Sequence, residues 1–250
     1  MKVHTIHNYL LNPEHPVTIN VIGCGGNGSQ VLTQLARINE ALKKLGHPGL
    51  YVTCFDNDRI TDSNIGRQLF SPAELGMNKA VALTTRLNRF FATNWKAVPI
   101  HYNQHVEEND RIANITITCV DSVKARKEIY KVMKSDAKKK NGDPLRKIFY
   151  WMDIGNSQNS GQFVLGTFDK KGLPHVFDKF PSFLKQKDKD TGPSCSLAEA
   201  LTKQDLFINS TLTQLAMSLL WKCFREGRIQ YHGAFINLET FKIAPIHIYA

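Results

Sequence analysis

Short apolar segments alternate with amphipathic helical segments through the first 153 residues, and this alternation limits the possible folds more than any other feature. The helical segments carry apolar residues on one face at 29–46, at 78–94 and from 121 to about 134. Buried strands are expected at 17–22, 51–55, 97–100, 115–120 and 148–152. Because strands and helices take turns along the chain, the pattern predicts a parallel sheet with helices on both faces.

The pattern changes after residue 155. An apolar strand at 161–168 follows without a crossover helix, which favours an antiparallel edge, and further strands are expected at 229–238 and 241–248. Residues 196 to about 226 are helical in pattern, with a break near 203–205. The sequence therefore predicts an α/β fold with a Rossmann-like, doubly wound, mostly parallel sheet and antiparallel strands in the C-terminal part. We expect one domain over residues 1–250, with an N-terminal arm at 1–16 and a basic crossover excursion at 169–195.

Composition sets limits on the class of protein. A chain of 250 residues with 42% hydrophobic residues can bury one substantial core. The cysteines show no CxxC spacing, which favours a reducing compartment and argues against a structural zinc site; they stand at positions 24, 54, 119, 195 and 223. No signal peptide or membrane-spanning run is evident, so we expect a soluble cytoplasmic protein that does not bind a membrane.

The net charge of +10 is unevenly distributed, since ten Lys or Arg and three acids fall between Lys124 and Lys147, and six Lys and two acids fall between Lys170 and Lys189. This balance favours anionic partners. A solvated helix face with basic loops would explain the same charges. Nucleic acid is not expected as a partner, because no reader motif or aromatic ladder accompanies the charge, whereas an acidic protein partner would fit.

A glycine-rich turn follows the first strand. Gly23-Cys24-Gly25-Gly26-Asn27-Gly28 matches GxGxxG between a strand and a helix, which is the context that a nucleotide fingerprint needs. Such a turn brings backbone N–H groups close to phosphate oxygens, although a tight turn without a ligand would have the same residues. It is not a P-loop, because Ser29-Gln30 stands where Lys and Ser or Thr would be required.

The segment 56–79 indicates which nucleotide would bind. Asp56 ends the second strand, where an acid can accept ribose hydroxyl groups. Two cations, Arg67 and Lys79, follow within one loop-to-helix segment, together with Asp58, Asn64 and Gln68. Taken singly, either cation would be an ordinary surface residue. In combination they suit a triphosphate whose pyrophosphate has to leave.

These motifs resemble those of the ThiF/MoeB family, the ubiquitin-activating-enzyme superfamily. The resemblance is specific over roughly 15–155 and weaker over 190–225. It is carried by the glycine loop, Asp56-Asn57-Asp58, the stretch from Asn64 to Gln68, Lys79, and Cys119-Val120-Asp121-Ser122. The segments PSCSLAEAL and GAFINLET resemble, more narrowly, the ThiF-like member of the PRTRC cassettes of mobile elements.

The resemblance implies ATP-dependent adenylylation of the C-terminal carboxylate of a small ubiquitin-like or sulfur-carrier protein ending in Gly. Asp56 would hold the ribose, Arg67 and Lys79 would contact the phosphates, and Asp121 would coordinate Mg²⁺. The other implied nucleotide-site residues are Gly23, Gly25, Gly26, Gly28, Asp58, Asn64, Gln68 and Ser122. A homodimer is implied as well, and a conjugating-enzyme-like protein is a further candidate partner.

Cys195 is the candidate nucleophile among the cysteines. It precedes a capping-box pattern that begins at Ser196, and a position just outside a helix N-terminus favours the thiolate. Members of the family that bond covalently to their partner carry a cysteine in a comparable region. A small residue packed at a helix start would explain Cys195 equally well.

Some features depart from the family. No CxxC pair is present, so zinc is not expected; Asn27 replaces the usual aliphatic residue of the glycine loop; and the first sixteen residues contain no arginine. His4 and His7 are expected on a pendant arm. Two other functions remain open, a non-catalytic nucleotide-binding scaffold for a partner tail and an NAD-dependent oxidoreductase.

Overall fold

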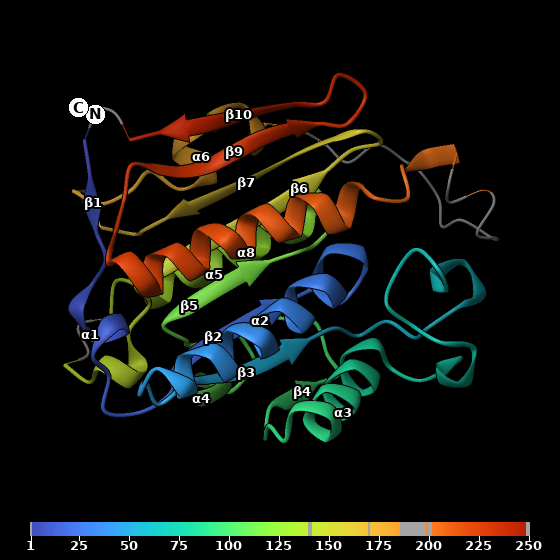
Figure 1. Ribbon diagram of the computed structural model, residues 1–250, viewed down its shortest axis with the longest axis horizontal. Coiled ribbons are helices and arrows are strands. Elements are labelled where there is room, and N and C mark those ends of the chain that lie inside the picture. Colours follow the sequence, from blue (N-terminus) through green and yellow to red (C-terminus); the bar gives the residue numbers. More distant parts are fainter. Residues whose placement is uncertain (1, 140–141, 170, 186–198, 200–201, 249–250) are drawn as a thin grey trace.

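A single eight-stranded sheet organises the protein (Figure 1). The computed structural model describes residues 2–139, 142–169, 171–185, 199 and 202–248. The strands lie in the order β10-β9-β7-β6-β5-β2-β3-β4. Strands β6 to β4 in this order are parallel, and β7, β9 and β10 are antiparallel, which confirms the predicted sheet. Their bounds are β2 Val17–Ile22, β3 Leu50–Phe55, β4 Lys96–Val98, β5 Ile115–Thr118, β6 Tyr150–Asn156, β7 Ser160–Gly166, β9 Tyr231–Asn237 and β10 Lys242–His247.

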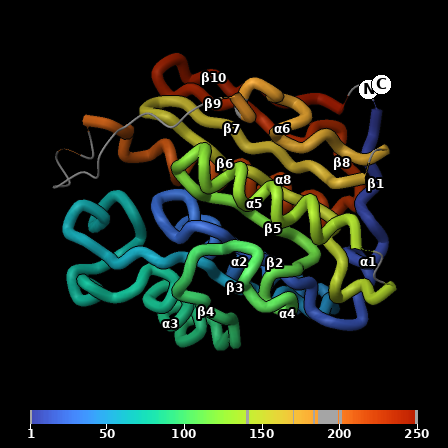
Figure 2. The backbone as a smooth tube through the Cα atoms, turned by 180° about the vertical axis from the view of Figure 1, so that it is seen from behind, coloured from blue at the N-terminus to red at the C-terminus, as the bar shows by residue number. Residues whose placement is uncertain are grey.

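Helices cover both faces of the sheet. On one face, α2 (Gly26–Lys44) packs against α8 (Ile208–Glu226), and α3 (Lys79–Phe91) lies beside α2 (Figure 1). On the other face lies α5 (Val123–Asp136), which comes to the front in the view from behind (Figure 2). Shorter helical turns connect these elements: α1 Asn8–Leu11, η1 Asp62–Asn64, η2 Pro72–Glu74, α4 Glu108–Arg111, η3 Pro144–Arg146, α6 Val176–Lys179 and η4 Pro181–Leu184.

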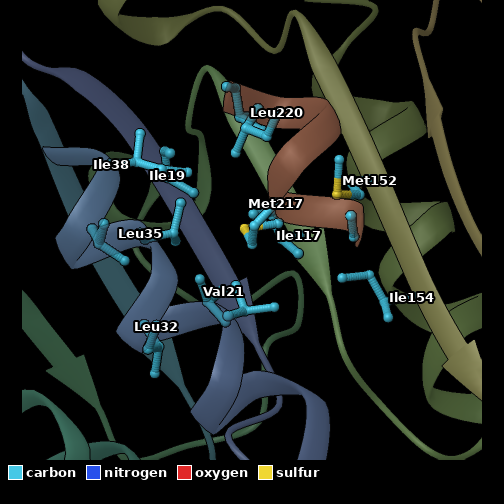
Figure 3. Close-up of a cluster of buried hydrophobic side chains, with 14 of the residues drawn as sticks. Ile19, Val21, Leu32, Leu35, Ile38, Ile117, Met152, Ile154, Met217 and Leu220 are labelled. Atoms are coloured by element: carbon cyan, nitrogen blue, oxygen red, sulfur yellow. The ribbon is translucent and has the colours of Figure 1, made fainter. Parts of the chain in front are cut away.

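The core lies between the central strands and the pair α2 and α8 (Figure 3). Its members come from elements that are far apart in the sequence, among them Ile19, Val21, Leu32, Leu35, Ile117, Met152, Ile154, Met217 and Leu220. The apolar positions predicted for α2 are buried, except that Leu45 is 57% exposed. The helix has ended by then, and the chain turns at Gly46 with a φ of +84°.

Several element boundaries differ from the sequence prediction, and two of these differences are informative. Helix α2 begins at Gly26 instead of residue 29, because the second half of the glycine loop forms its first turn. Strand β6 does not end at Asp153 but runs on to Asn156. Asp153 is 1% exposed and its Oδ1 accepts a hydrogen bond from Arg126 Nε at 2.7 Å, so the acid is tolerated inside the strand. The predicted break before α8 is confirmed, since residues 204–207 are not helical.

The N-terminal segment packs against the body of the protein. Strand β1 (His4–Thr5) pairs antiparallel with β8 (Arg228–Ile229), and Ile6 and Leu10 are buried in the core. His4 Nε2 lies 2.9 Å from the hydroxyl of Tyr150. His4 therefore belongs to a packed contact rather than to a pendant arm. Among the described residues, no helix is both long and apolar enough to cross a bilayer.

Candidate functional site

A cavity of about 590 Å³ opens at the carboxyl ends of the parallel strands. It lies where β2 and β5 are neighbours and their following helices leave to opposite faces, which is the place where open α/β sheets bind ligands. Most of the predicted site residues line it: Gly23, Gly25, Gly26, Asp56, Asp58, Arg67, Gln68, Lys79, Asp121 and Ser122. The topology thus brings together residues from three separate strand-to-helix connections of the sheet.

The glycine loop packs tightly enough to require its glycines. Gly23 has a φ of +90°, and a Cβ there would lie 3.0 Å from the Cys119 carbonyl oxygen. Gly28 does not line the cavity; a Cβ at this position would collide with the Gly23 carbonyl oxygen. Gly28 therefore allows the helix to start against the loop. The first N–H groups of α2 then face the cavity, where they can bind an anion.

Asp56 is fixed at the tip of β3 by two backbone donors. Its Oδ2 accepts the N–H of Cys24 at 2.6 Å, and its Oδ1 accepts the N–H of Asp58 at 2.8 Å. Burial raises the pKa of Asp56, and the two N–H groups oppose that effect. The carboxylate is therefore preorganised beside the glycine loop, and each oxygen keeps a further lone pair for a hydroxyl donor.

Lys79 begins α3 with its side chain 9% exposed. Its Nζ lies 3.0 Å from Oδ2 of Asp58, whose side chain is 59% exposed. Asn78 caps the helix through Val81 N–H and donates to the carbonyl oxygens of Asp56 and Asp58. These bonds join the tip of β3 to the start of α3. They hold a buried ammonium group at the cavity wall.

Arg67 lines the cavity and contacts the segment before α8. Its Nη1 donates to Gln204 Oε1 at 2.6 Å, while Nε is buried without a partner among the described residues. Burial lowers the pKa of Arg67, and the negative charge of Asp121 raises it. Gln68 is also buried, and its Oε1 has no partner within the described part of the chain. Buried polar atoms without partners on a cavity wall are suited to binding a ligand.

Asn64 lies behind this wall and does not line the cavity. Its Oδ1 accepts the N–H of Thr61 at 3.0 Å, and its carbonyl oxygen accepts the N–H of Gln68 at 2.9 Å. The side chain thus shapes the turn that carries Arg67 and Gln68. Its place is that of a supporting residue.

Asp121 and Ser122 lie where β5 passes into α5. Ser122 Oγ caps the helix by accepting the N–H of Ala125 at 2.9 Å, and Asp121 is exposed at the cavity. No three His, Cys, Asp or Glu side chains come together as a metal site in the described ranges. A single carboxylate at a cavity is nevertheless compatible with Mg²⁺ if a phosphate is bound there too, because Mg²⁺ usually keeps several waters and is completed by substrate phosphates.

Several lining residues were not singled out from the sequence as site residues. Asn27 was noted only as a departure from the family, and Arg126 only as part of a basic helix. Asn156 and Gln162 come from β6 and β7, and Gln204 and Asn209 come with α8. Gln204 and Asn209 reach the glycine loop because α8 packs on α2, which no local pattern reveals. The only signal for them in the sequence is the group of polar residues around the break before α8.

Cys195, the predicted nucleophile, lies outside the described residues. The other cysteines are buried: Cys24, Cys54, Cys119 and Cys223. Burial raises the pKa of the Cys119 and Cys223 thiols, which keeps them protonated and unreactive. Their role is packing.

Known structures share this fold at low sequence identity. PaaA matches with a TM-score of 0.63 and 15% identity, covering 94% of this chain and 64% of PaaA. E. coli MccB, solved with ATP, matches with a TM-score of 0.61 and 17% identity over 95% of this chain and 64% of MccB. The microcin C7 biosynthetic enzyme MccB in complex with N-formylated MccA matches with a TM-score of 0.60 and 17% identity, over 92% and 64%.

This chain therefore spans less than two thirds of the length of these relatives. A comparison with curated proteins found no match. The family model described as "ThiF family" matches residues 15–247, which is nearly the whole chain. The protein belongs to the ThiF family.

Proposed function

We propose that this protein uses ATP to adenylylate the C-terminal carboxylate of a small ubiquitin-like or sulfur-carrier protein. One observation carries the proposal: a single cavity holds an acid suited to ribose, two cations suited to phosphates, and a free helix N-terminus. Family membership and the similarity to an MccB structure solved with ATP support the same chemistry. MccB structures with the MccA substrate further support a small protein or peptide as the partner.

In the proposed reaction a carboxylate oxygen bonds to the α-phosphorus of ATP. The bond from that phosphorus to the bridging oxygen breaks, and pyrophosphate leaves. Since the nucleophile is already ionised, no general base is required. The obstacle is the approach of two anions, and Lys79 and Arg67 would stabilise the charge that accumulates on the phosphates. Lys79 is suited to this because its ammonium group is already held by Asp58 before ATP binds.

Asp121 would hold Mg²⁺ at this site. Its side chain is exposed at the cavity and close enough to influence Arg67, so a cation bound there would lie beside the phosphates. Mg²⁺ would supply further positive charge for the departing pyrophosphate. Ser122, through its cap on α5, would keep the turn that carries Asp121 in place.

The finer parts of the proposal follow the family resemblance. We propose that the protein is a cytoplasmic homodimer of the PRTRC type and that its partner ends in Gly. We further propose that it passes the activated partner to a conjugating-enzyme-like protein. Sedimentation analysis of the purified protein tests the dimer. The set of neighbouring genes tests the PRTRC assignment.

Pyrophosphate exchange tests the central step. The protein is incubated with ATP, Mg²⁺ and labelled pyrophosphate, together with members of a panel of small β-grasp proteins that end in Gly. We expect at least one of them to drive label into ATP, and the same protein with a C-terminal carboxamide to drive none. ATP binding without exchange by any member of the panel would favour a non-catalytic scaffold. A rise in melting temperature with NAD but not with ATP would favour an oxidoreductase.

Transfer of the acyl group from the adenylate to Cys195 is a second proposed step. The thiolate would attack the carbonyl carbon of the adenylate, a thioester would form, and AMP would leave. Cys195→Ala should then keep pyrophosphate exchange and lose a thiol-sensitive adduct with the partner. An undiminished adduct in this variant would exclude Cys195 as the acceptor.

A further inference from the structure

The cavity has two chemically different halves. Asp56, Asp58 and Lys79 gather at the end of β3, with Arg67 and Asp121 beside them. The end of β6 and the start of β7 contribute uncharged side chains, and the charged side chain beside them, Arg126 of α5, is paired with Asp153. The uncharged group consists of Asn27, Asn156, Ser157, Ser160, Gln162 and Asn209. Between β3 and β6 lie three strand spacings, or about 14 Å. A ribose held at Asp56 would therefore lie well away from the uncharged half.

Asn27 stands at the start of α2 in the uncharged half, and its amide orientation follows from its neighbours. Asn156 Nδ2 donates to the Ser157 carbonyl oxygen at 3.0 Å, which leaves Asn156 Oδ1 as an acceptor. Asn27 Nδ2 donates to that oxygen at 2.8 Å. The remaining atom, Asn27 Oδ1, is buried and has no partner among the described residues, although Asn27 lines the cavity and is only 7% exposed. The pair thus presents a fixed acceptor that requires a donor.

The groups of the proposed reaction that meet in this half offer few donors. Phosphate oxygens and a carboxylate only accept hydrogen bonds, and the ribose hydroxyl groups belong at Asp56. A polypeptide tail whose last carboxylate reaches the α-phosphate brings one main-chain N–H per residue. Those N–H groups have to be paired when the tail enters the cavity. An amide-lined wall provides acceptors for them without adding charge beside the reacting anions.

We propose that Asn27, held by Asn156, accepts a hydrogen bond from a main-chain N–H of the substrate tail within its last two residues. The site then requires a secondary amide at that place and rejects a tail with proline or an N-methyl residue there. This inference rests on the proposed function, and it adds a requirement on the substrate. Asn27 is a specificity-determining residue, and Asn156 is the positioning residue that fixes its orientation.

The test uses fluorescein-labelled hexapeptides of sequence Ala-Ala-Ala-Ala-Gly-Gly with a free carboxylate. The parent is compared with two analogues that are N-methylated at the last or at the penultimate peptide bond. Binding to the full chain is measured by fluorescence anisotropy with a non-hydrolysable ATP analogue present. We expect one analogue to bind the wild-type protein roughly ten- to a hundredfold more weakly than the parent, because a buried acceptor is left unpaired.

Asn27→Leu replaces the amide by an aliphatic side chain of similar size. We expect this variant to bind the parent as weakly as the affected analogue, so that the discrimination disappears, while its affinity for ATP stays within twofold of the wild type. Asn156→Ala should reduce the discrimination in the same direction. It keeps the test open if Asn27→Leu fails to fold.

Four outcomes would overturn the proposal. Both analogues could bind like the parent, the parent could fail to bind at all, or the discrimination could survive in Asn27→Leu. A loss of ATP affinity in Asn27→Leu would instead assign the acceptor to the nucleotide, and this too overturns it. Failure of the proposed function is separate, since peptide binding with the expected discrimination but no pyrophosphate exchange would contradict adenylylation alone.

Discussion

Buried carboxamides at the two ends of the sheet serve opposite purposes. At the amino end, Asn114 accepts the N–H of Thr18 and donates to the carbonyl oxygens of Pro144 and Lys147, and Asn39 accepts the N–H of Leu50. At the carboxyl end, Asn27 and Gln68 each keep a buried oxygen without a partner among the described residues. Because a buried polar group without a partner destabilises the fold, the first pair maintains structure and the second is suited to a ligand.

The largest effect is expected at the charged half of the cavity. Lys79→Ala should lower the rate of adenylylation about a hundred- to a thousandfold, since a preorganised cation for the phosphates is lost. The melting temperature should change little, because the pair with the exposed Asp58 adds little stability. Pyrophosphate exchange and thermal unfolding measure the two quantities.

Lys96→Ala is a matched control for this variant. Lys96 also pairs with an aspartate, Asp110, at 2.7 Å, but it begins the edge strand β4 and does not line the cavity. Its removal should leave the exchange rate unchanged. Equal losses in the two variants would contradict a phosphate-binding role for Lys79.

Asn114→Leu should produce the largest loss of stability. The change leaves one backbone N–H and two carbonyl oxygens without their partner, and we expect the free energy of unfolding to fall by about 3 kcal/mol or more. For a chain of this size that corresponds to a drop of roughly 6–12 °C in melting temperature. ATP affinity below the transition should be unchanged. A weaker ATP affinity in the folded variant would contradict the interpretation that Asn114 maintains structure without affecting the ligand site.

Asp56 should make ATP binding depend on pH. Burial raises its pKa, so the carboxylate is protonated at a higher pH than an ordinary aspartate. Binding requires the ionised form as an acceptor, and the Kd for ATP should therefore rise as the pH falls through that raised pKa. Asp56→Asn should bind ATP more weakly and lose this component of the pH dependence. Titration calorimetry measures the Kd of both proteins across the pH range, and the comparison between them removes the contribution from the titration of ATP itself. Parallel profiles of Kd against pH would contradict the role of Asp56 as an acceptor for ATP.

The smallest effect is expected for Gln68→Leu, and its sign is informative. Removing an unpaired buried oxygen should leave the free energy of unfolding unchanged or raise it by up to about 1 kcal/mol, whereas Asn114→Leu lowers it. ATP affinity should fall about five- to tenfold if Gln68 contacts the nucleotide. Urea unfolding and calorimetry give both values. A destabilised Gln68→Leu would show that this amide maintains structure after all.

The fold was predictable where the signal is local. Strand β2 has the predicted bounds 17–22, and its neighbour β3 differs by one residue, because apolar runs that end at Gly or Asp mark buried parallel strands. Asp153 was read as a strand end for the same reason. Its partner Arg126 lies far away in the sequence, and no local pattern reveals that an acid inside a strand is paired.

The candidate site was likewise predictable where its residues follow a local sequence pattern, and not where they come together through long-range contacts. Asp56, Arg67 and Lys79 lie in one short segment with recognisable spacing, and the structure places all three at the cavity. Gln204 and Asn209 reach it only because α8 packs beside α2, which is a tertiary event. Asn64 shows the converse case, since a residue inside the motif turned out to lie behind the wall.

The pairing of β1 with β8 has a consequence for how the chain folds. His4 meets Ile229 across almost the whole length of the chain, and contacts of such separation form late because a long loop must close first. While a ribosome is still making α8, Ile6 and Leu10 lack their neighbours Leu220 and Cys223, and Asn209 is not yet beside the glycine loop. A nascent chain would therefore already carry the phosphate-binding motifs and still lack a finished pocket. Nucleotide competence should appear only once α8 has been made and has packed on α2, in the same step that fixes the N-terminal segment.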